Sequence, residues 1–464
     1  MTTPGDPVGA ALRPRSADEL RTIFQRLREA GRELTQLPLP QLLEPLDRLA
    51  GLWQPGGPYF ARACDLLTGV FSRRAVEAAL QGLTLGLKAP VLYAELRREL
   101  GRPDLLDAWQ PDEVHAGLVR GYPLGVVAQV LAGNVFLGGV VALAQALLTR
   151  NAVLLKLSRE DSGFTALFAD TLRQADERGV LSRALAVCAW DSQHQELNDV
   201  VRSEADAVVV WGGASAIAGY PADRCRGRVI HYGPRLGVGL VLNGVDLDAA
   251  LPALAWDVAL WEQRACSSPR LLLVEDDDSG GLPGRVAEGL SRALGRVRTS
   301  FPARALTLDE KAEVLSIREL AWWTDGAEVY QGPGSMDHTV LVAAKIPREI
   351  PVGHRTVLVV PVKSLDGLPA ALEPYREFLQ TAVLAAPPAR WPEAVDVLVR
   401  SGLTQVTAAG AASARVLGLP HEGEYALRRL VRLVGIDLGY GPLVYPERDP
   451  ATLAAVAAAL TAGQ

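Results

Sequence analysis

The spacing of apolar residues changes about a quarter of the way along the chain. Up to residue ~110, apolar positions recur three and four residues apart. This spacing predicts amphipathic helices over residues 17–33, 39–52, 75–85 and 92–100. The run Pro55–Gly56–Gly57–Pro58 interrupts the series. This first segment shows no evident chemistry and is expected to form a helical layer that covers another part of the molecule.

From Tyr122 onward, uninterrupted apolar runs alternate with helical patterns. The runs at 125–131, 152–157, 184–189 and 207–211 predict buried strands, and 140–148, 164–175 and 193–202 predict helices. Apolar strands joined by helices are typical of a parallel, doubly wound sheet. Ligands of such sheets bind at the carboxyl ends of the strands.

A second α/β series occupies the rest of the chain. Strands are predicted at 238–242, 270–275, 338–344, 356–362, 381–385 and 403–407. Helices are predicted at 251–261, 283–294, 391–400 and 425–434, with an alanine-rich helix at 451–460. The expected fold class is therefore α/β in both halves, after a helical N-terminal segment.

The length and charge of the chain indicate how many domains it has and which kinds of partner it binds. A chain of 464 residues is too long for one simple core, so two or three domains are expected. The net charge of −6 argues against a nucleic-acid partner. The uncharged run 121–149 has the length of a membrane span. Gln129, Gly133 and Asn134 interrupt it, so it is interpreted as strand, turn and helix.

Cysteine and histidine usage indicates neither disulfides nor a metal. Cys64, Cys188, Cys225 and Cys266 are too few and too far apart for a disulfide framework or a zinc site. The six histidines are dispersed, so no metal is expected. No signal peptide is visible, because the charged N-terminus has no apolar core behind it. A cytoplasmic location is the expectation.

Cys266 is the first candidate for a nucleophile. It lies between the predicted helix 251–261 and the predicted strand 270–275, and Ser267–Ser268–Pro269 ends any helix there. A thiol at such a junction can meet a substrate in a cleft. The alternative is a buried cysteine that acts as a small hydrophobe.

Polar residues follow the predicted strands. Asn134 can donate to an oxyanion, although Gly133–Asn134 is also ordinary turn chemistry. Lys156, followed by Ser158 and Arg159, can bond ribose hydroxyls, and Arg159 can meet a 2′-phosphate. A solvated basic turn is the competing interpretation of these three residues.

Two further segments carry weaker signals. Gly212 and Gly213 follow a strand, where backbone N–H groups can hold a pyrophosphate. The chain has no G-x-G-x-x-G, so this pair alone is weak evidence. His231 precedes a strand and is interpreted as a structural histidine.

Three segments in order resemble the long-chain acyl-CoA reductase family of the bacterial bioluminescence system, within the aldehyde dehydrogenase superfamily. They are Leu-Ala-Gly-Asn-Val at 131–135, Asn-Ala-Val-Leu-Leu-Lys-Leu-Ser at 151–158 and Gln-Arg-Ala-Cys-Ser-Ser-Pro at 263–269. Pro-His-Glu-Gly at 420–423 is a weaker echo. The resemblance covers about residues 110 to 440.

The resemblance implies an aldehyde-dehydrogenase-like fold. Its expected parts are a helical segment at 1–110, a Rossmann-like NADP(H)-binding domain at 111–250, a catalytic domain at 251–430 and a C-terminal segment at 431–464. Homo-oligomers are usual in the superfamily, so a homo-oligomer is expected.

Roles for single residues also follow from the resemblance. Cys266 matches the nucleophile that becomes acylated, and Asn134 matches the oxyanion asparagine. Lys156 and Ser158 match positions at the adenine ribose, and Gly212–Gly213 matches the turn near the pyrophosphate. Arg159 favours NADPH, with NADH also compatible.

The expected reaction is NADPH-dependent reduction of a fatty acyl thioester to the aldehyde. The donor is acyl-CoA or a carrier-protein thioester, since both present the same reacting group. One departure supports a reductase: the superfamily's water-activating glutamate is absent, because the matching segment 231–237 has no carboxylate. Phe136 stands where the family often has proline. An acyltransferase or thioesterase that uses Cys266 without hydride transfer, and a non-catalytic scaffold, stay open as alternatives.

Overall fold

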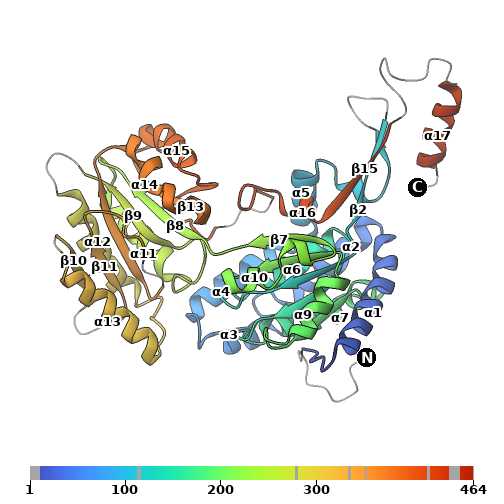
Figure 1. Cartoon of the computed structure of the whole chain (residues 1–464), viewed down its shortest axis with the longest axis horizontal. Helices are drawn as coiled ribbons and strands as arrows, with labels where there is room; N and C mark the ends of the chain where they lie inside the picture. The colour runs from blue at the N-terminus through green and yellow to red at the C-terminus, as the bar shows by residue number, and fades with distance from the viewer. Residues whose placement is uncertain are drawn as a thin grey trace.

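The computed structural model shows two α/β lobes, each built on its own sheet, and a three-stranded antiparallel arm that projects from one lobe (Figure 1). It describes residues 11–111, 117–276, 281–324, 326–332, 336–350, 353–414, 418–437 and 450–462. The expected α/β fold class is confirmed.

Five N-terminal helices pack on the first lobe. They are α1 (Ala17–Thr35), α2 (Leu39–Leu52), α3 (Phe60–Leu67), α4 (Arg73–Gly86) and α5 (Ala89–Leu100). Their apolar stripes do not form a separate core but join the core of the neighbouring sheet. Trp53 shows this link: it is fully buried, packs against Phe164 and Phe168, and donates from Nε1 to Thr171 Oγ1 at 2.9 Å.

The first lobe contains a five-stranded parallel sheet in the order β5-β4-β3-β6-β7. Its strands are β3 (Val126–Val130), β4 (Ala152–Leu157), β5 (Leu185–Ala189), β6 (Ala207–Trp211) and β7 (Arg228–Tyr232). Its helices are α6 (Leu137–Leu148), α7 (Phe164–Ala175), α8 (Val180–Arg183), α9 (Gln195–Glu204) and α10 (Ala214–Ala218). The chain runs outward from β3 to β5 and then crosses to β6 on the other side of β3. The carboxyl ends of β4, β3 and β6 are therefore neighbours, as the doubly wound prediction requires.

The second lobe contains a seven-stranded sheet in the order β10-β11-β12-β9-β8-β13-β14, parallel except for the β10–β11 pair. Its strands are β8 (Leu236–Val241), β9 (Pro269–Glu275), β10 (Glu328–Gln331), β11 (Thr339–Val342), β12 (Thr356–Val362), β13 (Leu379–Ala385) and β14 (Gln405–Ala408). Its helices are α11 (Leu247–Ala259), α12 (Leu282–Val297), α13 (Leu308–Trp322), α14 (Leu368–Leu372) and α15 (Trp391–Arg400).

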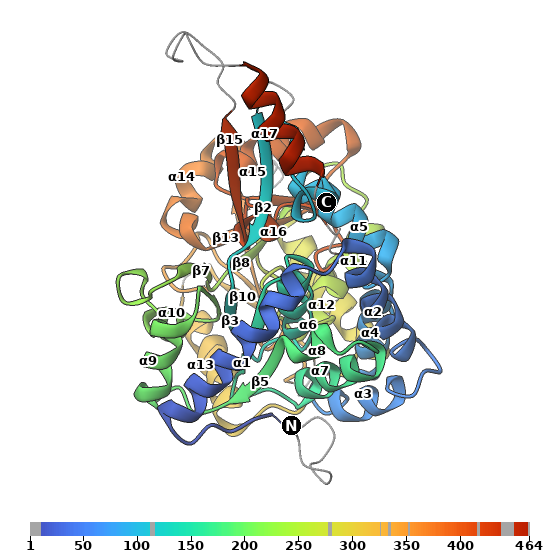
Figure 2. The same ribbon diagram turned by 90° about the vertical axis from the view of Figure 1, so that its right-hand side faces the viewer.

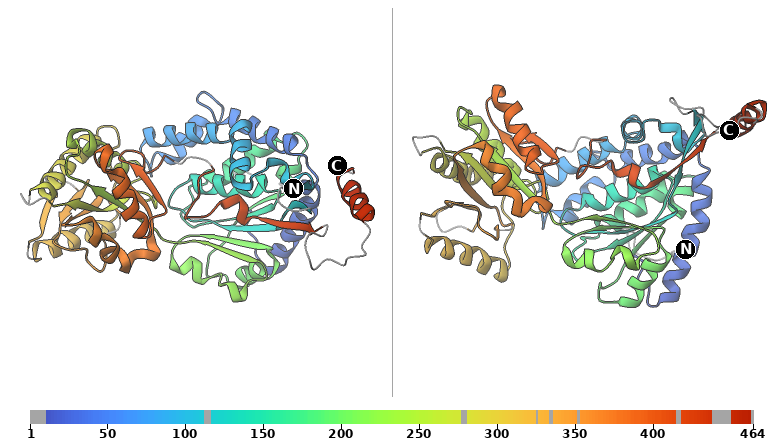
Figure 3. Two further views of the ribbon diagram at one scale, coloured as in Figure 1. Left: turned by 90° about the horizontal axis from the view of Figure 1, so that it is seen from above. Right: turned by 45° about the horizontal axis from the view of Figure 1, so that its top comes forward.

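Both faces of this second sheet are buried. Leu272 and Val274 of β9 pack with α11 and α12, whereas Leu271 and Leu273 pack with α14 and α15 on the other face. Successive side chains of a strand point to opposite faces, so two buried faces need an uninterrupted apolar run. The views from above show the helices of this lobe on both sides of its sheet (Figure 3).

β8 shifts one expected boundary. It lies within residues 111–250, yet it pairs with β9 and β13 of the second lobe. The passage between the lobes therefore comes near Tyr232 and Leu236, before the expected boundary at 250. Sequence spacing could not show this, because a buried parallel strand has the same pattern in either sheet.

The predicted helix at 425–434 is wrong. Only α16 (Ala426–Arg429) is helical, and β15 (Val431–Asp437) pairs with β2 (Gly117–Pro123) in an antiparallel arm that also includes β1 (Gln110–Pro111). Figure 2 shows β15 beside β2 in this arm. Ladder hydrogen bonds to a strand more than 300 residues earlier in the sequence outweigh the local helical spacing. The last described helix is α17 (Pro450–Ala462). Within the described ranges, no helix is both long and apolar enough to cross a membrane.

Candidate active site

Cys266 lies in the short loop that joins α11 to β9, and this loop contacts the first lobe through the bond from Asn134 to the Arg264 carbonyl oxygen. The side chain is half-buried, and none of the four cysteines forms a disulfide. β8 lies directly against this loop, because Gly237 pairs with Pro269 and any Cβ at Gly237 would lie 2.4 Å from the Ser268 carbonyl oxygen. The cysteine is thus held at the edge of the sheet in the way the sequence predicted.

The surroundings of Cys266 favour the protonated thiol over the thiolate. Burial raises the pKa of the thiol above 9.0, and the Glu422 carboxylate raises it further. Hydrogen bonds from the backbone N–H groups of Cys266 and Ser267, together with the charge of Arg270, act in the opposite direction. A nucleophilic role therefore requires a group that removes the proton.

Buried polar groups at the start of the loop fix its shape. Glu262 and Gln263 both have left-handed backbone conformations, with φ of 53° and 55°. Gln263 is fully buried, and its Nε2 donates to the carbonyl oxygens of Pro269 at 3.0 Å and of Thr356 at 2.8 Å. Glu262 forms a buried ion pair with Arg355. The sequence alone does not indicate these roles, although Gln263 lies within the segment that carries the resemblance.

Asn134 meets the cysteine loop from the other lobe. It follows β3, and its Nδ2 donates to the carbonyl oxygen of Arg264 at 3.0 Å. Arg264 in turn pairs with Glu160 after β4 at 2.8 Å. Gly133 is required beside Asn134, because a Cβ there would lie 2.5 Å from Ser158 Oγ. The structure therefore brings Asn134 and the loop of Cys266 together, as expected.

Phe136 explains the departure from proline noted in the sequence. Its buried ring packs edge-on against Phe164 at 4.8 Å and lies 6.0 Å from Trp261 and 5.9 Å from Phe71 between centroids. Phe71 lies between α3 and α4, Phe164 begins α7, and Trp261 follows α11. Phe136 thus joins the Asn134 turn to the segment that leads into the cysteine loop.

The predicted cofactor residues follow neighbouring strands at one edge of the first sheet. Lys156 lies one residue before the end of β4 and pairs with Val130 of β3. It is buried over the ring of Trp190, at 5.5 Å, and burial lowers its pKa. The Oγ of Ser158 is buried and has no hydrogen-bond partner among the described residues. An unpaired buried hydroxyl and a buried amine at this edge suit the hydroxyls of a ribose.

Arg159 is exposed and forms an ion pair with Asp191 at 2.5 Å. The sequence alone does not indicate this partner, because it lies 32 residues away in the chain. Asp191 follows β5, and its other oxygen accepts the backbone N–H of Gln193 at 2.9 Å. The hydrogen bonds of Gln193 and Arg159 lower the pKa of Asp191. An arginine held this way could exchange its carboxylate for a phosphate.

The remaining predicted residues lie at the same edge. Gly212 and Gly213 follow β6, whose end lies beside β3, but they precede a helix of only five residues. His231 lies on β7, and its Nε2 is 3.2 Å from the carbonyl oxygen of Tyr220, which agrees with a structural role.

A turn at residues 421–424 contacts β7 and the residue before β8. Glu422 pairs with Arg235, the residue before β8, and both side chains are largely buried, at 10% and 21% exposed. His421 stacks on Tyr232 at 5.2 Å, and Tyr232 stacks on Trp211 at 4.0 Å. The spacing of Pro-His-Glu-Gly in the sequence does not indicate these contacts, because their partners lie almost 200 residues earlier in the chain.

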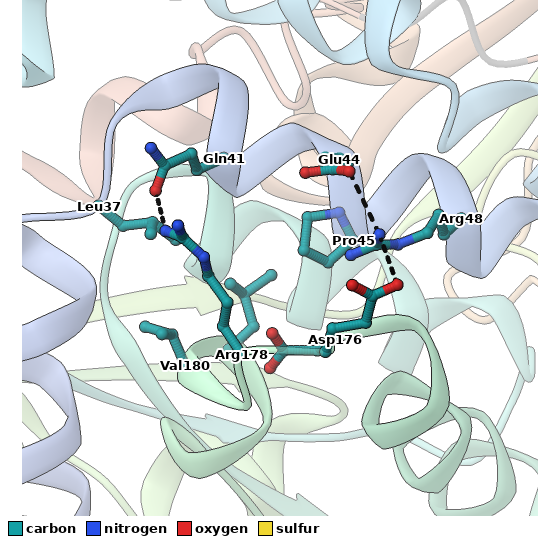
Figure 4. Close-up of a pocket in the computed structure, with 10 residues that line it drawn as sticks. Leu37, Gln41, Glu44, Pro45, Arg48, Asp176, Arg178 and Val180 are labelled. Atoms are coloured by element: carbon teal, nitrogen blue, oxygen red, sulfur yellow. Dashed lines mark hydrogen bonds and ion pairs between the residues drawn. The ribbon is translucent and has the colours of Figure 1, made fainter.

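A surface cavity of about 50 Å³ lies elsewhere, between α2 and the loop before α8 (Figure 4). Arg48 pairs there with Glu44 at 3.2 Å and Glu177 at 3.0 Å, and Arg178 bonds Gln41. These groups already satisfy one another, so the cavity is a packing gap rather than the site.

The two sheets, the arm and the cysteine loop together define the aldehyde dehydrogenase fold. Glyceraldehyde-3-phosphate dehydrogenase GapN from Methanocaldococcus jannaschii, solved with NADP, has a TM-score of 0.71 at 14% identity, covering 92% of this chain and 95% of that one. Indole-3-acetaldehyde dehydrogenase complexed with NAD+ has a TM-score of 0.68 at 18% identity, covering 90% and 88%. At such identities the likeness shows the fold alone.

Within this fold the chain belongs to the family described as acyl-CoA reductase (LuxC), which it matches over residues 34–433. The long-chain acyl-protein thioester reductase of Photobacterium phosphoreum is 27% identical over 376 residues, which are 78% of this chain and 71% of that protein. The protein of the same name from Vibrio harveyi is 26% identical over 364 residues, 75% and 71% of the two chains. The family expected from the three segments is thereby confirmed.

Proposed function

We propose that this chain reduces an acyl thioester to the corresponding aldehyde, with NADPH as reductant and an acyl-enzyme on Cys266. The observation that carries the proposal is the contact between the lobes, in which the Asn134 amide bonds the Arg264 carbonyl two residues before Cys266. This contact between Asn134 and the loop that carries Cys266 supports an oxyanion role for the Asn134 amide. Membership of the acyl-CoA reductase family supports the same reaction.

The chain's own residues act on the acyl group in sequence. The Cys266 sulfur attacks the thioester carbonyl, and the Asn134 amide and the Cys266 backbone N–H donate to the developing oxyanion. Removing one such donor costs about 10²–10³ in rate. A thiolate leaves readily and takes up the proton that Cys266 loses, so this step needs no strong acid. The aldehyde is released when the bond from its carbon to the Cys266 sulfur breaks.

The edge of the first sheet fits a nicotinamide dinucleotide. Lys156 and the unpaired Ser158 hydroxyl would hold the adenine ribose, and Arg159 would hold a 2′-phosphate. Gly212 and Gly213 would lie at the pyrophosphate. The bound cofactor supplies a hydride to the acyl carbon. In this proposal the first lobe binds the cofactor and the second lobe carries the cysteine.

The acyl donor is the finer part of the proposal. Long-chain acyl-protein thioester reductases are similar over three quarters of this chain, and their name supports a donor bound to a protein thiol. An acyl-CoA presents the same thioester. Either donor, an acyl-protein or an acyl-CoA, is therefore proposed to bring its thioester carbonyl to Cys266. The protein is proposed to act as a homo-oligomer in the cytoplasm.

The test mixes purified protein with NADPH and a long-chain acyl thioester and follows both nicotinamide absorbance and aldehyde. Acyl-CoA and acyl-carrier protein are supplied in parallel. Equal amounts of NADPH consumed and aldehyde formed are expected, and Cys266→Ala should abolish both while NADPH still binds. Cys225→Ala is the matched control, because Cys225 is also half-buried but lies outside the site.

Two outcomes would contradict the proposal. Release of the thiol without loss of NADPH would indicate an acyltransferase or thioesterase. Full turnover in Cys266→Ala would remove the cysteine from the reaction.

A further inference from the structure

Helix α13 carries apolar side chains on two sides, of which the fold covers only one. Val314 is buried, and Ile317 and Ala321 pack against the core of the second lobe. A surface helix normally has a single apolar stripe that faces the core, so a second stripe indicates a partner. The large apolar residues that stay exposed on α13 and its C-terminal cap are Leu308 at 83%, Leu315 at 52%, Leu320 at 70%, Trp322 at 78% and Trp323 at 77%.

This exposed side of α13 is large enough for an interface with another protein. Two tryptophans and three leucines exposed to this degree present on the order of 600 Å² of apolar surface, which is as much as the largest patch on a typical monomer. Each partner of a standard interface buries about 800 Å². The helix lies at the lower edge of the second lobe in Figure 1, and the exposure of its side chains leaves them accessible to a partner.

The exposed positions are arranged symmetrically about Leu315. Leu308 lies seven residues before it, and Trp322 lies seven residues after it. Seven residues are close to two full turns of an α-helix, so the three side chains form one stripe along the same face. The stripe therefore has an apolar side chain at its centre and one at equal distance on either side.

The charges beside this stripe are complementary to each other. Lys311 lies four residues before Leu315, Glu319 lies four residues after it, and both side chains are exposed. Within the part of the chain that the structure describes, Lys311 has no ion-pair partner. Glu319 accepts from Trp323 Nε1 at 2.8 Å through Oε1. A positive and a negative charge thus lie at equal distances on either side of the same centre.

We propose that this side of α13 binds the same side of α13 in a second copy of the chain, with the helices antiparallel and a two-fold axis at Leu315. Lys311 of each copy then lies opposite Glu319 of the other, and Leu308 lies opposite Trp322. A two-fold interface requires a surface that is complementary to itself, and this arrangement provides one. A partner surface of a single charge would attract one of the two charged residues and repel the other. The inference goes beyond the proposed reaction at Cys266 and does not depend on it.

A cysteine at the proposed axis tests the contact directly. Leu315→Cys puts the same thiol of both copies at the axis, so mild oxidation of the dilute protein should link two chains through residue 315. Leu85→Cys is the matched control, because Leu85 is also an exposed leucine on a helix, at 67%, and it should stay unlinked. The unmodified chain is oxidised in parallel to account for its four free cysteines. Linked chains are separated on a non-reducing gel, and mass spectrometry identifies the linked peptide.

Charge reversal tests whether the partner is the chain itself. Lys311→Glu or Glu319→Lys alone sets like charges opposite each other at both symmetric positions. Either variant should raise the dissociation constant of self-association, measured by analytical ultracentrifugation, about tenfold, because two exposed ion pairs are lost in each dimer. The double variant restores opposite charges and should return to within about twofold of the unmodified chain.

Linkage through residue 315, together with recovery in the double variant, supports the proposal. No linkage at residue 315, or a double variant that associates as weakly as the single ones, overturns it. If Lys311→Glu leaves self-association unchanged and instead weakens the binding of acyl-carrier protein, this side of α13 belongs to that partner and the inference is wrong. Neither measurement involves turnover, so a chain that reduces no acyl thioester would contradict the proposed function and leave this inference in place.

Discussion

Gln263→Leu tests whether the buried amide holds the cysteine loop. Gln263 Nε2 donates to the Pro269 and Thr356 carbonyl oxygens, so the substitution removes both bonds within a fully buried site. Each lost bond that orphans a buried acceptor costs about 1–3 kcal/mol. The Oε1 of Gln263 has no partner among the described residues, and leucine removes that desolvation cost, which offsets about 1–3 kcal/mol. The net loss in free energy of unfolding is about 2 kcal/mol.

The loss should be concentrated in the loop around Cys266. Denaturant unfolding measures the global change, and iodoacetamide labelling of native Cys266 measures local opening. A local change of about 2 kcal/mol would favour the open loop roughly 30-fold, so labelling should accelerate. Gln54→Leu is the matched control, because Gln54 is exposed. Unchanged stability and unchanged labelling in Gln263→Leu would refute the role assigned to this amide.

Three further substitutions test other parts of the structure. Phe136→Ala should lower the free energy of unfolding by about 3–5 kcal/mol in denaturant titrations, because it opens a cavity between three aromatic rings, and a wild-type midpoint would contradict the packing. Burial lowers the pKa of His338 from 6.5 to about 4. The folded pKa lies below the unfolded one, so stability is present above pH 6.5 and is lost as the pH falls toward 4. The loss reaches about 3 kcal/mol. In His338→Gln, the free energy of unfolding should depend less on pH between 6.5 and 4. An unchanged pH dependence in this range would exclude His338 as its source. Arg159→Ala should raise the KM for NADPH about tenfold and leave that for NADH nearly unchanged, since one charge-assisted bond is worth about 1.5–3 kcal/mol; equal effects would remove Arg159 from the choice of cofactor.

The sequence predicts much of the fold because buried parallel strands are long apolar runs. Strands β4, β6 and β12 begin and end at the residues that the apolar runs predict. β15 could not be predicted in this way. Its residues are mostly exposed, and its partner β2 is distant in the chain, so only long-range pairing distinguishes it from the end of a helix.

Only some residues of the candidate site could be predicted from the sequence. Cys266 and Asn134 could be found from the sequence, because each lies at a strand end or a break between elements where chemistry is expected. Glu422, Arg235 and Asp191 could not, since each acts through a partner from another part of the chain. Local spacing carries no information on such pairs.

The most direct test of the central claim is a chase of the acyl-enzyme. The unmodified protein is incubated with a long-chain acyl thioester without NADPH, and the modified peptide is located by mass spectrometry. The account predicts one acyl group on Cys266, which disappears when NADPH is added and is recovered as an equal amount of aldehyde. An acyl group on another residue, or one recovered from Cys266 as free acid, would contradict it.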